Sequence, residues 1–490
     1  MVVKILTGMA GLVLALLAVI AVNTLRIGPP PLPEILPPTE IAIDTTAMAQ
    51  RLAQAVRFPT VSHGREAPVA DEALRGLRGF ITQSFPLVHK TLKRELINGY
   101  SLLYTWDGTD PELRPILLAA HMDVVPVEPG TEKDWTHPPF AGVVADGFIW
   151  GRGTMDMKVS LIGILEAVEY LLGQDFVPKR TIYLAFGHDE ELGGPNGATK
   201  IAEFLEKRGV HLYFTLDEGL VITHGIIPGV AKPAALIGLA EKGFVTLELI
   251  ARGRGGHSSM PPTTTAVGRL GRAIQRLETN QMPAALRRPA ADMFEHLAPE
   301  MPIPMRAVLA NRWLFEPLLI SRLEENAATN ALIRTTTALT MIAGGVKPNV
   351  VPQEARAVIN FRILPGDSGD SVTEHVQAVI DDPNIEVRSF GKVPSAPSPV
   401  SNVGSASFAA LRLTVRQVFP DVVVAPGLLM GRTDSRHYVR ITENSYRFLP
   451  MQLTNQDLKR IHGTDERIAI KNYAEIIRFY VQLLLNTAVE

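Results

Sequence analysis

The chain has 490 residues, of which 46% are hydrophobic and 20% are charged. This length predicts roughly two or three domains with a sizeable core, and the composition argues against long disorder. The 48 Lys and Arg residues nearly balance the 50 Asp and Glu residues, so no basic excess is available for general nucleic-acid binding. Cysteine is absent, which excludes disulfides and thiolate chemistry and leaves His, Asp and Glu as metal ligands.

Residues 1–28 have the pattern of a targeting segment. Ile5 to Val22 is apolar apart from one threonine and two glycines, and about 18 apolar residues are just enough to span a bilayer. Ala21-Val22-Asn23 is a poor cleavage site, so we favour an uncleaved signal-anchor over a cleaved signal peptide. Lys4 favours an N-terminus inside. The body would then lie outside the cytoplasm, in the periplasm, in a lumen or at the cell surface, and would be secreted if the segment were cleaved.

After a proline-rich stretch at 29–44, which predicts a stiff spacer, the chain has the pattern of an α/β protein. Helical periodicity occurs at 45–57, 159–172 and 198–208, and short apolar runs typical of buried strands occur at 116–120, 181–186 and 212–216. This alternation predicts a mostly parallel sheet covered by helices, which we assign to residues 45–240 as the first part of a catalytic domain.

The pattern changes at residues 241–394, where we expect an inserted α+β lid domain of the kind that can mediate dimerisation. Strands are expected at 244–251, 335–342 and 355–363, with helices at 266–277 and 371–380. Residues 282–320 are rich in Pro, Met, Phe and Leu, and form either lid core or the lining of a groove for an acyl chain. The strand–helix pattern resumes at 395–490 and ends in a helix at 470–485, which completes the catalytic domain.

Carboxylates and histidines gather after the predicted parallel strands, where α/β proteins place their sites. The segments are His121-Met122-Asp123, the Asp156 loop, Glu190-Glu191, Asp217-Glu218-Gly219 and, later, His462. Singly, each has an ordinary interpretation, such as a turn or a solvated acidic face. Jointly, they would repel one another without a cation, and two histidines with several carboxylates suffice for two divalent metals such as zinc.

Longer motifs strengthen this interpretation. HMDVVPV, GRGTMDMK, DEELGG, LDEG, GGHSSMPP and GVKPNVVP, in this order, resemble the di-zinc metallopeptidase family of aminoacylase, glutamate carboxypeptidase and succinyl-diaminopimelate desuccinylase. WLFEPLL, IRTTTALT and KRIHG are more similar to the branch of carboxypeptidase S and the N-fatty-acyl-amino-acid synthase/hydrolase. The resemblance covers nearly all of the chain after Thr45.

The resemblance implies a role for each matching residue. It makes His121 and Asp217 the ligands of one zinc, Glu191 and His462 the ligands of the other, Asp156 the bridge, Glu190 the general base and Asp123 the partner of His121. Glu218 stays open as the alternative to Asp217, and cobalt or manganese could replace zinc. In the lid, His257 would stabilise the oxyanion, often from the partner subunit of a dimer, while Asn349 and Arg362 would hold the substrate carboxylate. For these three, roles in a turn or a strand salt bridge remain alternatives.

The implied activity is metal-dependent hydrolysis of an amide bond next to a free α-carboxylate, in N-acyl amino acids or at peptide C-termini. A carboxypeptidase or dipeptidase without acyl preference is the alternative. A serine hydrolase using Gly366-Asp367-Ser368-Gly369 is disfavoured, because this motif precedes a predicted helix whose N-cap we assign to Asp367 or Ser371. A non-enzymatic receptor-like module would lack ligands or base, and all are present here.

Overall fold

The computed structural model describes residues 2–28, 38–391 and 393–489, so most of the predicted spacer lies outside the described residues. Helix α1 (Val2–Arg26) covers the predicted targeting segment, and its portion Lys4–Arg26 is long and apolar enough to cross a membrane. A signal sequence near the N-terminus can meet the same criteria, so the helix alone is compatible with either form of targeting.

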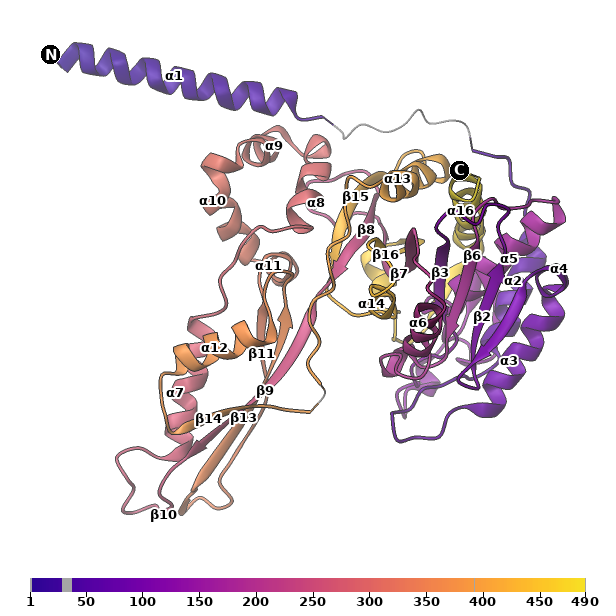
Figure 1. Ribbon diagram of the computed structural model, residues 1–490. Coiled ribbons are helices and arrows are strands. Elements are labelled where there is room, and N and C mark those ends of the chain that lie inside the picture. The colour runs from indigo at the N-terminus through magenta and orange to yellow at the C-terminus, as the bar shows by residue number, and fades with distance from the viewer. Residues whose placement is uncertain (1, 29–37, 392, 490) are drawn as a thin grey trace. The chain divides into compact units, whose positions relative to one another are not determined.

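The chain folds as two compact units (Figure 1). Unit 1 contains the described residues of Met1–Leu239, Asp292–Ala310 and Ser401–Glu490, and unit 2 contains Ala240–Ala291 and Asn311–Val400. The segment 292–310, which lies inside the predicted insertion, therefore groups with unit 1. Contacts within unit 1 explain this grouping, because the ring of His296 packs edge-on against Phe408 at 6.4 Å and Lys232 pairs with Glu300 at 3.0 Å.

Within the described residues, unit 1 is built on an eight-stranded sheet with the order β1-β2-β6-β3-β7-β16-β8-β15. Its strands are β1 (Lys93–Ile97), β2 (Ser101–Trp106), β3 (Ile116–His121), β6 (Ile182–Gly187), β7 (Phe214–Thr223), β8 (Ala234–Glu241), β15 (Val423–Leu429) and β16 (Ser445–Leu453). The neighbouring strands β6, β3, β7 and β16 are parallel, whereas β1, β2 and β8 pair antiparallel. The predicted mostly parallel α/β sheet is thus confirmed.

Helices cover both faces of this sheet because side chains alternate across each strand. Leu118 and Leu184 belong to a core that includes α2 (Thr45–Val56), α3 (Asp71–Ser84), α5 (Lys158–Gly173), α13 (Ala406–Val418) and α16 (Ile470–Thr487), with α4 (Pro86–Thr91) packing on α5. Their neighbours Leu117 and Ala185 pack on the opposite face with α6 (Ala198–Lys207) and α14 (Ser435–Tyr438). These bounds confirm the predicted helices of unit 1 to within about two residues.

A small three-stranded sheet connects the start of the catalytic region with its end. It has the order β17-β5-β4, with β4 (Val143–Ala145), β5 (Phe148–Trp150) and β17 (Arg467–Ala469). Arg467 pairs with Trp150 across the β17–β5 ladder. Residues that follow Trp150 therefore lie beside residues that precede Arg467, although more than 300 positions separate them in the sequence.

Unit 2 has the predicted α+β architecture. Its antiparallel sheet has the order β11-β13-β9-β14, from strands β9 (Gly243–Arg252), β11 (Thr336–Gly344), β13 (Glu354–Ile363) and β14 (Ile385–Ser389). Helices α7 (Ala266–Thr279) and α12 (Gly369–Ile380) cover one face, and a ribbon of β10 (Gly256–His257) and β12 (Val350–Val351) extends from it. The segment before β11 forms α8 (Ala290–Leu297) and α9 (Ile303–Ala310), which lie almost entirely in the part that groups with unit 1, and then α10 (Arg312–Glu324) and α11 (Ala327–Ile333) of unit 2.

The N-cap of α12 differs from the sequence assignment. Ser368 itself is the cap: its hydroxyl accepts the Ser371 N–H at 3.0 Å, and the Ser371 hydroxyl accepts the Ser368 N–H at 2.9 Å. This reciprocal pair is a capping box, with serine in place of the usual Glu or Gln. The Asp367 carboxylate, which we had assigned as a possible cap, instead accepts hydrogen bonds from the Arg287 guanidinium and the Thr335 hydroxyl. Ser368 therefore has a structural role at a helix start.

We expect Gly163→Ala to stabilise the protein by ~1 kcal/mol, the usual helix-propensity gain. Gly163 lies within α5, and an added methyl group would meet Ile476, Tyr473 and Tyr480 of α16 at 3.5–3.8 Å, ordinary contact distances. Gly79→Ala in α3, where nothing lies within 4 Å of the new methyl, is the matched control for propensity without packing. Urea unfolding of both variants tests this, and a loss of stability at Gly163 with a gain at Gly79 would contradict it.

Candidate metal centre

The candidate ligands reach one edge of the unit 1 sheet from separate segments. His121 is the last residue of β3, and it pairs with Gly187 at the end of β6. Glu190 and Glu191 open a short 3₁₀ turn three residues beyond β6, Glu218 lies within β7, and Asp156 sits in the loop that leads into α5. His462 comes from the loop before β17. The parallel strands end together, so ligands distant in sequence meet.

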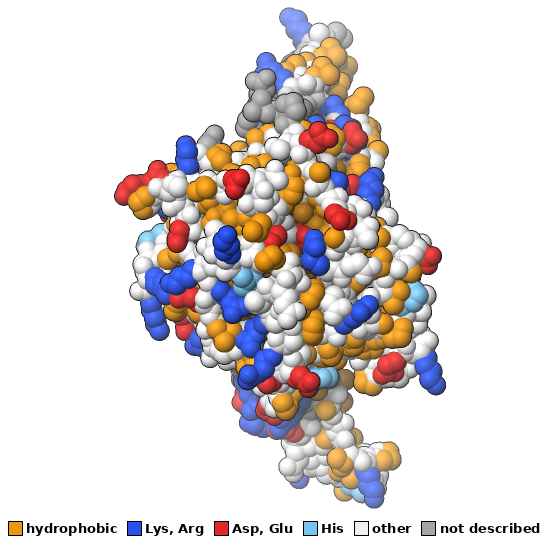
Figure 2. Space-filling model, turned by 90° about the vertical axis from the view of Figure 1, so that its right-hand side faces the viewer, with side chains coloured by type: hydrophobic (Ala, Val, Ile, Leu, Met, Phe, Trp, Pro, Cys, Tyr) orange, Lys and Arg blue, Asp and Glu red, His pale blue; other side chains and the backbone are white. Residues whose placement is uncertain are grey.

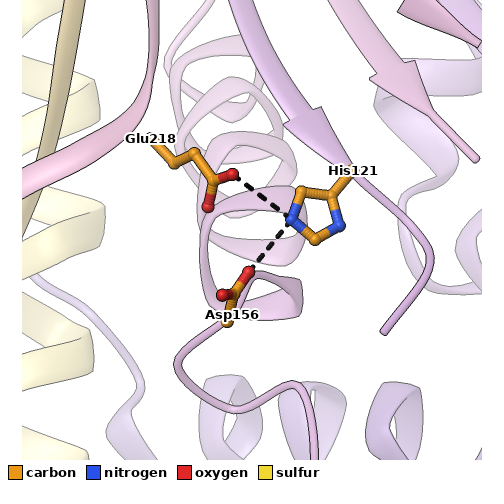
Figure 3. Close-up of side chains that lie close together, drawn as sticks. All are labelled: His121, Asp156 and Glu218. Carbon is orange, nitrogen blue, oxygen red and sulfur yellow. Dashed lines mark hydrogen bonds and ion pairs between the residues drawn. The ribbon is translucent and has the colours of Figure 1, made fainter. Parts of the chain in front are cut away.

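Two clusters of ligand atoms form at this edge and share one carboxylate. In the first, His121 Nε2 lies 3.0 Å from Asp156 Oδ1 and 3.5 Å from Glu218 Oε1 (Figure 3). In the second, His462 Nε2 lies 3.0 Å from Asp156 Oδ2 and 3.5 Å from Glu191 Oε1. Each cluster could hold a metal ion. Because each oxygen of Asp156 faces a different imidazole, this carboxylate is placed to bridge two ions.

The first cluster contains Glu218 and does not include the neighbouring Asp217. Adjacent residues in a strand point to opposite faces, and it is Glu218 that points toward His121 (Figure 3). The buried Asp217 carboxylate instead accepts the Glu218 N–H at 2.9 Å. Within the described residues, its Oδ2 has no hydrogen-bond partner. The geometry of this cluster therefore favours Glu218, the alternative that the sequence analysis left open, and the choice between the two residues stays a prediction.

Asp123 connects His121 with Glu190 and Glu191. His121 Nδ1 lies 2.9 Å from the Asp123 carbonyl oxygen and 3.4 Å from its carboxylate, so the closer acceptor is the backbone. The carboxylate accepts the N–H groups of Glu190 and Glu191 at 3.1 and 3.2 Å and the Ser62 hydroxyl at 2.7 Å. Asp123 therefore orients both glutamates through their backbone, beyond the expected support of His121.

Burial and mutual repulsion raise the pKa values of most of these carboxyls. Burial, followed by the nearby Asp156 charge, raises the pKa of Glu218 to about 8. Burial, followed by the Glu218 charge, raises the pKa of Glu190 well above its usual value. Hydrogen bonds to Asp156 and Glu191 raise the pKa of His462 to about 10. Protons on these groups and a bound cation would therefore compete for the same negative charge, as is usual for metal ligands.

The donor set fits divalent metal ions. It consists of imidazole nitrogens and carboxylate oxygens without sulfur, which suits zinc, cobalt or manganese. Glu191 Oε1 is buried, and among the described residues it makes no hydrogen bond of ordinary geometry beyond its long 3.5 Å contact with His462 Nε2. A buried acceptor left in this state is costly unless a cation or donor meets it.

The unit 2 residues do not come together at one point. His257 pairs with Val350 in the β10–β12 ribbon, and the Ser258 N–H donates to the Asn349 carbonyl at 3.1 Å, so His257 and Asn349 are close neighbours. The His257 ring contacts the Ser259 hydroxyl at 2.8 Å and is exposed. Arg362 instead pairs with Phe244 at the other end of β13. At about 3.3 Å per residue, the eight steps from Glu354 to Arg362 span roughly 25 Å.

The sequence analysis gave no role to Arg152 or Glu466, which form a buried ion pair at 2.6 Å beside the ligand loops. In the sequence, the only feature that pointed to Glu466 was its place four residues after His462. Such a signal is weak, because Glu and Asp are common near loop ends. The contact becomes visible only through the β17–β5 pairing.

Comparison with known proteins agrees with this geometry. Residues 117–486 match peptidase family M20/M25/M40. The chain is 45% identical over 485 residues to a probable carboxypeptidase S-like 2 of Dictyostelium discoideum, covering 97% of this chain and 93% of that protein. It is 43% identical over 446 residues to an N-fatty-acyl-amino acid synthase/hydrolase of Xenopus tropicalis, covering 90% and 86% respectively.

Solved structures show the same fold. An M20 family metallo-carboxypeptidase from Sulfolobus solfataricus aligns with a TM-score of 0.62 at 19% identity, covering 90% of this chain and 99% of that one. A dinuclear metal-binding M20 peptidase of Bacillus subtilis aligns with a TM-score of 0.54 at 14% identity, covering 90% and 99%. With two ligand clusters joined through Asp156 and a family match over most of its length, the chain belongs to peptidase family M20/M25/M40 and is a metallohydrolase.

Proposed function

We propose that the protein uses two zinc ions to hydrolyse amide bonds next to a free α-carboxylate, in N-acyl amino acids or at peptide C-termini. The observation that carries this proposal is the placement of Asp156 between His121 and His462, 3.0 Å from each imidazole. The similarity to a probable carboxypeptidase S-like protein and to an N-fatty-acyl-amino acid synthase/hydrolase supports this substrate class.

In this proposal His121, Asp156 and Glu218 hold one ion, and Asp156, Glu191 and His462 hold the other. Bound divalent ions would polarise the scissile carbonyl and acidify a water molecule. Glu190 takes the proton from that water and passes it to the leaving amine. Asp123 keeps Glu190 in place by accepting its backbone N–H at 3.1 Å. The raised pKa of Glu190 in the metal-free chain reflects a buried, weakly solvated carboxyl, which a neighbouring cation would ionise.

The unit 2 residues suit oxyanion and carboxylate binding, and their separation supports a homodimer. His257 would donate to the oxyanion, and Asn349 and Arg362 would hold the substrate carboxylate. Because Arg362 lies roughly 25 Å along β13 from the ribbon that carries His257, one small substrate cannot contact all three within a single copy of unit 2. Two copies could supply them together. The edge strand β11, with Met341 and Ile342 exposed, offers a surface for pairing.

An apolar acyl side is supported by the segment between β9 and β11. Met301 and Leu309 are buried, but Ile303, Trp313 and Leu318 are 71%, 64% and 53% exposed. Exposed apolar side chains on consecutive helices are unusual for a surface without an apolar ligand or partner. We propose that Trp313 and Leu318, which both lie on α10, contact the acyl chain of the substrate. The alternative is a carboxypeptidase or dipeptidase without acyl preference, which similarity to carboxypeptidase S of Saccharomyces cerevisiae also supports.

We further propose that α1 anchors the protein in a membrane with the body outside the cytoplasm, or directs secretion if cleaved. The length and apolar composition of Lys4–Arg26 support this. The substrate is a small molecule or short peptide rather than nucleic acid. On the face drawn in Figure 2, Lys and Arg side chains occur together with Asp and Glu side chains, as the balanced composition suggests.

Metal removal tests the ligand assignment. A chelator should abolish hydrolysis, and zinc or cobalt should restore it. Glu218→Gln should lose about one zinc per chain by elemental analysis, because its carboxylate faces His121. Asp217→Asn removes charge from the adjacent residue, which lies outside both clusters, and should keep both ions. The reverse pattern would return the ligand role to Asp217.

Neighbouring glutamates should show opposite phenotypes. Glu190→Gln keeps the size of the side chain but cannot accept a proton, so turnover should fall by about two to four orders of magnitude while zinc content stays near two per chain. Glu191→Gln should lose zinc instead, because its Oε1 lies 3.5 Å from His462 Nε2 in the second cluster. Kinetics paired with metal analysis distinguish the roles. Zinc loss in Glu190→Gln with metal retention in Glu191→Gln would exchange the two assignments.

A series of N-acyl amino acids tests the substrate class. Each methylene buried against the apolar segment should add about 0.8 kcal/mol, or close to fourfold in kcat/KM. Amidation of the α-carboxylate should cost at least ~1.5 kcal/mol, the lower range for a charged hydrogen bond. Trp313→Ala should flatten the chain-length profile without changing acetyl-amino-acid hydrolysis. A flat profile in the unmodified protein, with good dipeptide cleavage, would favour the carboxypeptidase or dipeptidase alternative.

A further inference from the structure

A buried ion pair joins the two loops that carry Asp156 and His462. Arg152 Nη1 donates to Glu466 Oε2 at 2.6 Å, and the two side chains are 3% and 0% exposed. The Gly151 N–H also donates to the Glu466 carbonyl at 2.9 Å, which continues the β17–β5 pairing. Two charges are held away from water here, an arrangement that carries a desolvation penalty and is not required for stability, since apolar residues can often replace such pairs.

Glu466 fixes the backbone of the shared ligand. Its Oε1 accepts the N–H groups of Gly153, Met155 and Asp156 at 2.9, 2.8 and 3.2 Å. Three donors converging on one carboxylate oxygen define the path of this loop. The Asp156 side chain is thereby presented with one oxygen toward His121 and the other toward His462.

Arg152 fixes the other loop. Its Nη2 donates to the His462 carbonyl at 3.1 Å, and its guanidinium lies 5.4 Å from the Trp135 ring centroid. His462 needs this support, because its side chain is 51% exposed and its backbone has a φ of 60°, an unfavourable conformation for a residue other than glycine. Asp465, with a φ of 57°, is held by Thr136 through bonds of 2.7 and 2.8 Å.

We infer that Arg152 and Glu466 are positioning residues that set the distance between Asp156 and His462, and so the affinity of the second metal site. This inference rests on the proposed two-metal function. Glu466 holds the backbone N–H of Asp156 and Arg152 holds the backbone carbonyl of His462, so weakening their bond lets the two ligands move apart. His121 and Glu218 lie on strands β3 and β7, and the first site should be affected less.

The test uses full-length Glu466→Gln and Arg152→Lys. The glutamine variant keeps an oxygen for the three N–H groups but turns an amide NH₂ toward Arg152. The lysine variant keeps the positive charge but cannot reach Glu466 and the His462 carbonyl together. Zinc bound per chain is measured by elemental analysis across a series of chelator-buffered free zinc concentrations. Both variants should bind the second zinc about 10- to 100-fold more weakly, the usual effect of losing a partner that orients a ligand. The first zinc shares Asp156 but takes His121 and Glu218 from strands, so its binding should weaken less than that of the second zinc.

The double variant Glu466→Gln with Arg152→Gln provides the rescue. Two amides can donate and accept between them without an unpaired charge, so part of the second-site affinity should return. The control is Arg208→Lys, which alters the surface ion pair with Glu95 and should leave zinc binding unchanged. Melting temperatures of the metal-free proteins report on folding independently of metal.

Two results would overturn the inference. One is a zinc titration of Glu466→Gln and Arg152→Lys that matches the unmodified protein. The other is equal weakening of both sites, with a lowered melting temperature of the metal-free variants and no rescue in the double variant. That result would mean that the pair stabilises the fold as a whole and does not position the second site. Failure of the proposed function has a different signature, because the unmodified protein would then bind fewer than two zinc ions.

Discussion

The site depends on how negative charge is compensated around Asp156. Each oxygen of this carboxylate lies 3.0 Å from a different imidazole. Glu218 lies 3.5 Å from the His121 imidazole, and Glu191 lies 3.5 Å from the His462 imidazole. Without a cation, carboxyls this close repel one another, and the pKa of Glu218 rises to about 8 because of burial and then the Asp156 charge. Two divalent ions, one in each cluster, would compensate the negative charge and so remove that repulsion.

The scaffold holds these groups with backbone contacts more than with side-chain pairs. Asp123 accepts the N–H groups of Glu190 and Glu191, and Glu466 accepts those of three residues ending at Asp156. A carboxylate that accepts several N–H groups fixes the main chain of the loop that donates them. The chemistry thus depends on two acidic residues that are not ligands, each buried behind a ligand-bearing loop.

Much of this fold could be predicted because buried parallel strands appear as continuous apolar runs. The run at 116–120 and the acidic ends of the neighbouring strands were sufficient to place His121 and Glu191 at one edge. The choice between Asp217 and Glu218 was not predictable in this way. It depends on which face of β7 is turned toward His121, and side-chain alternation makes a one-residue difference decisive. Likewise, the role of Ser368 as a cap depended on where α12 begins, and helix starts are uncertain by one or two residues.

The grouping of residues 292–310 with unit 1 could not be predicted from the sequence for a different reason. Its apolar residues suit any core, and only contacts such as His296 with Phe408 determine which core they join. Ile303 therefore belongs to unit 1, whereas Trp313 belongs to unit 2.

All metal-cluster residues belong to unit 1, whereas His257, Asn349 and Arg362 belong to unit 2. Bond cleavage requires fixed ligand distances, which the strand ends and the Arg152–Glu466 pair provide. Substrate choice requires side chains that can be exchanged without changing those distances. In unit 2, His257, Asn349 and Arg362 are such exposed side chains. If the proposed roles hold, a substitution at the apolar segment or at Arg362 would change which amide is cleaved while the ligand clusters of unit 1 stay intact. Changes at Asp123 or Glu466 reach the metal centre directly, because each holds the backbone of residues that line it.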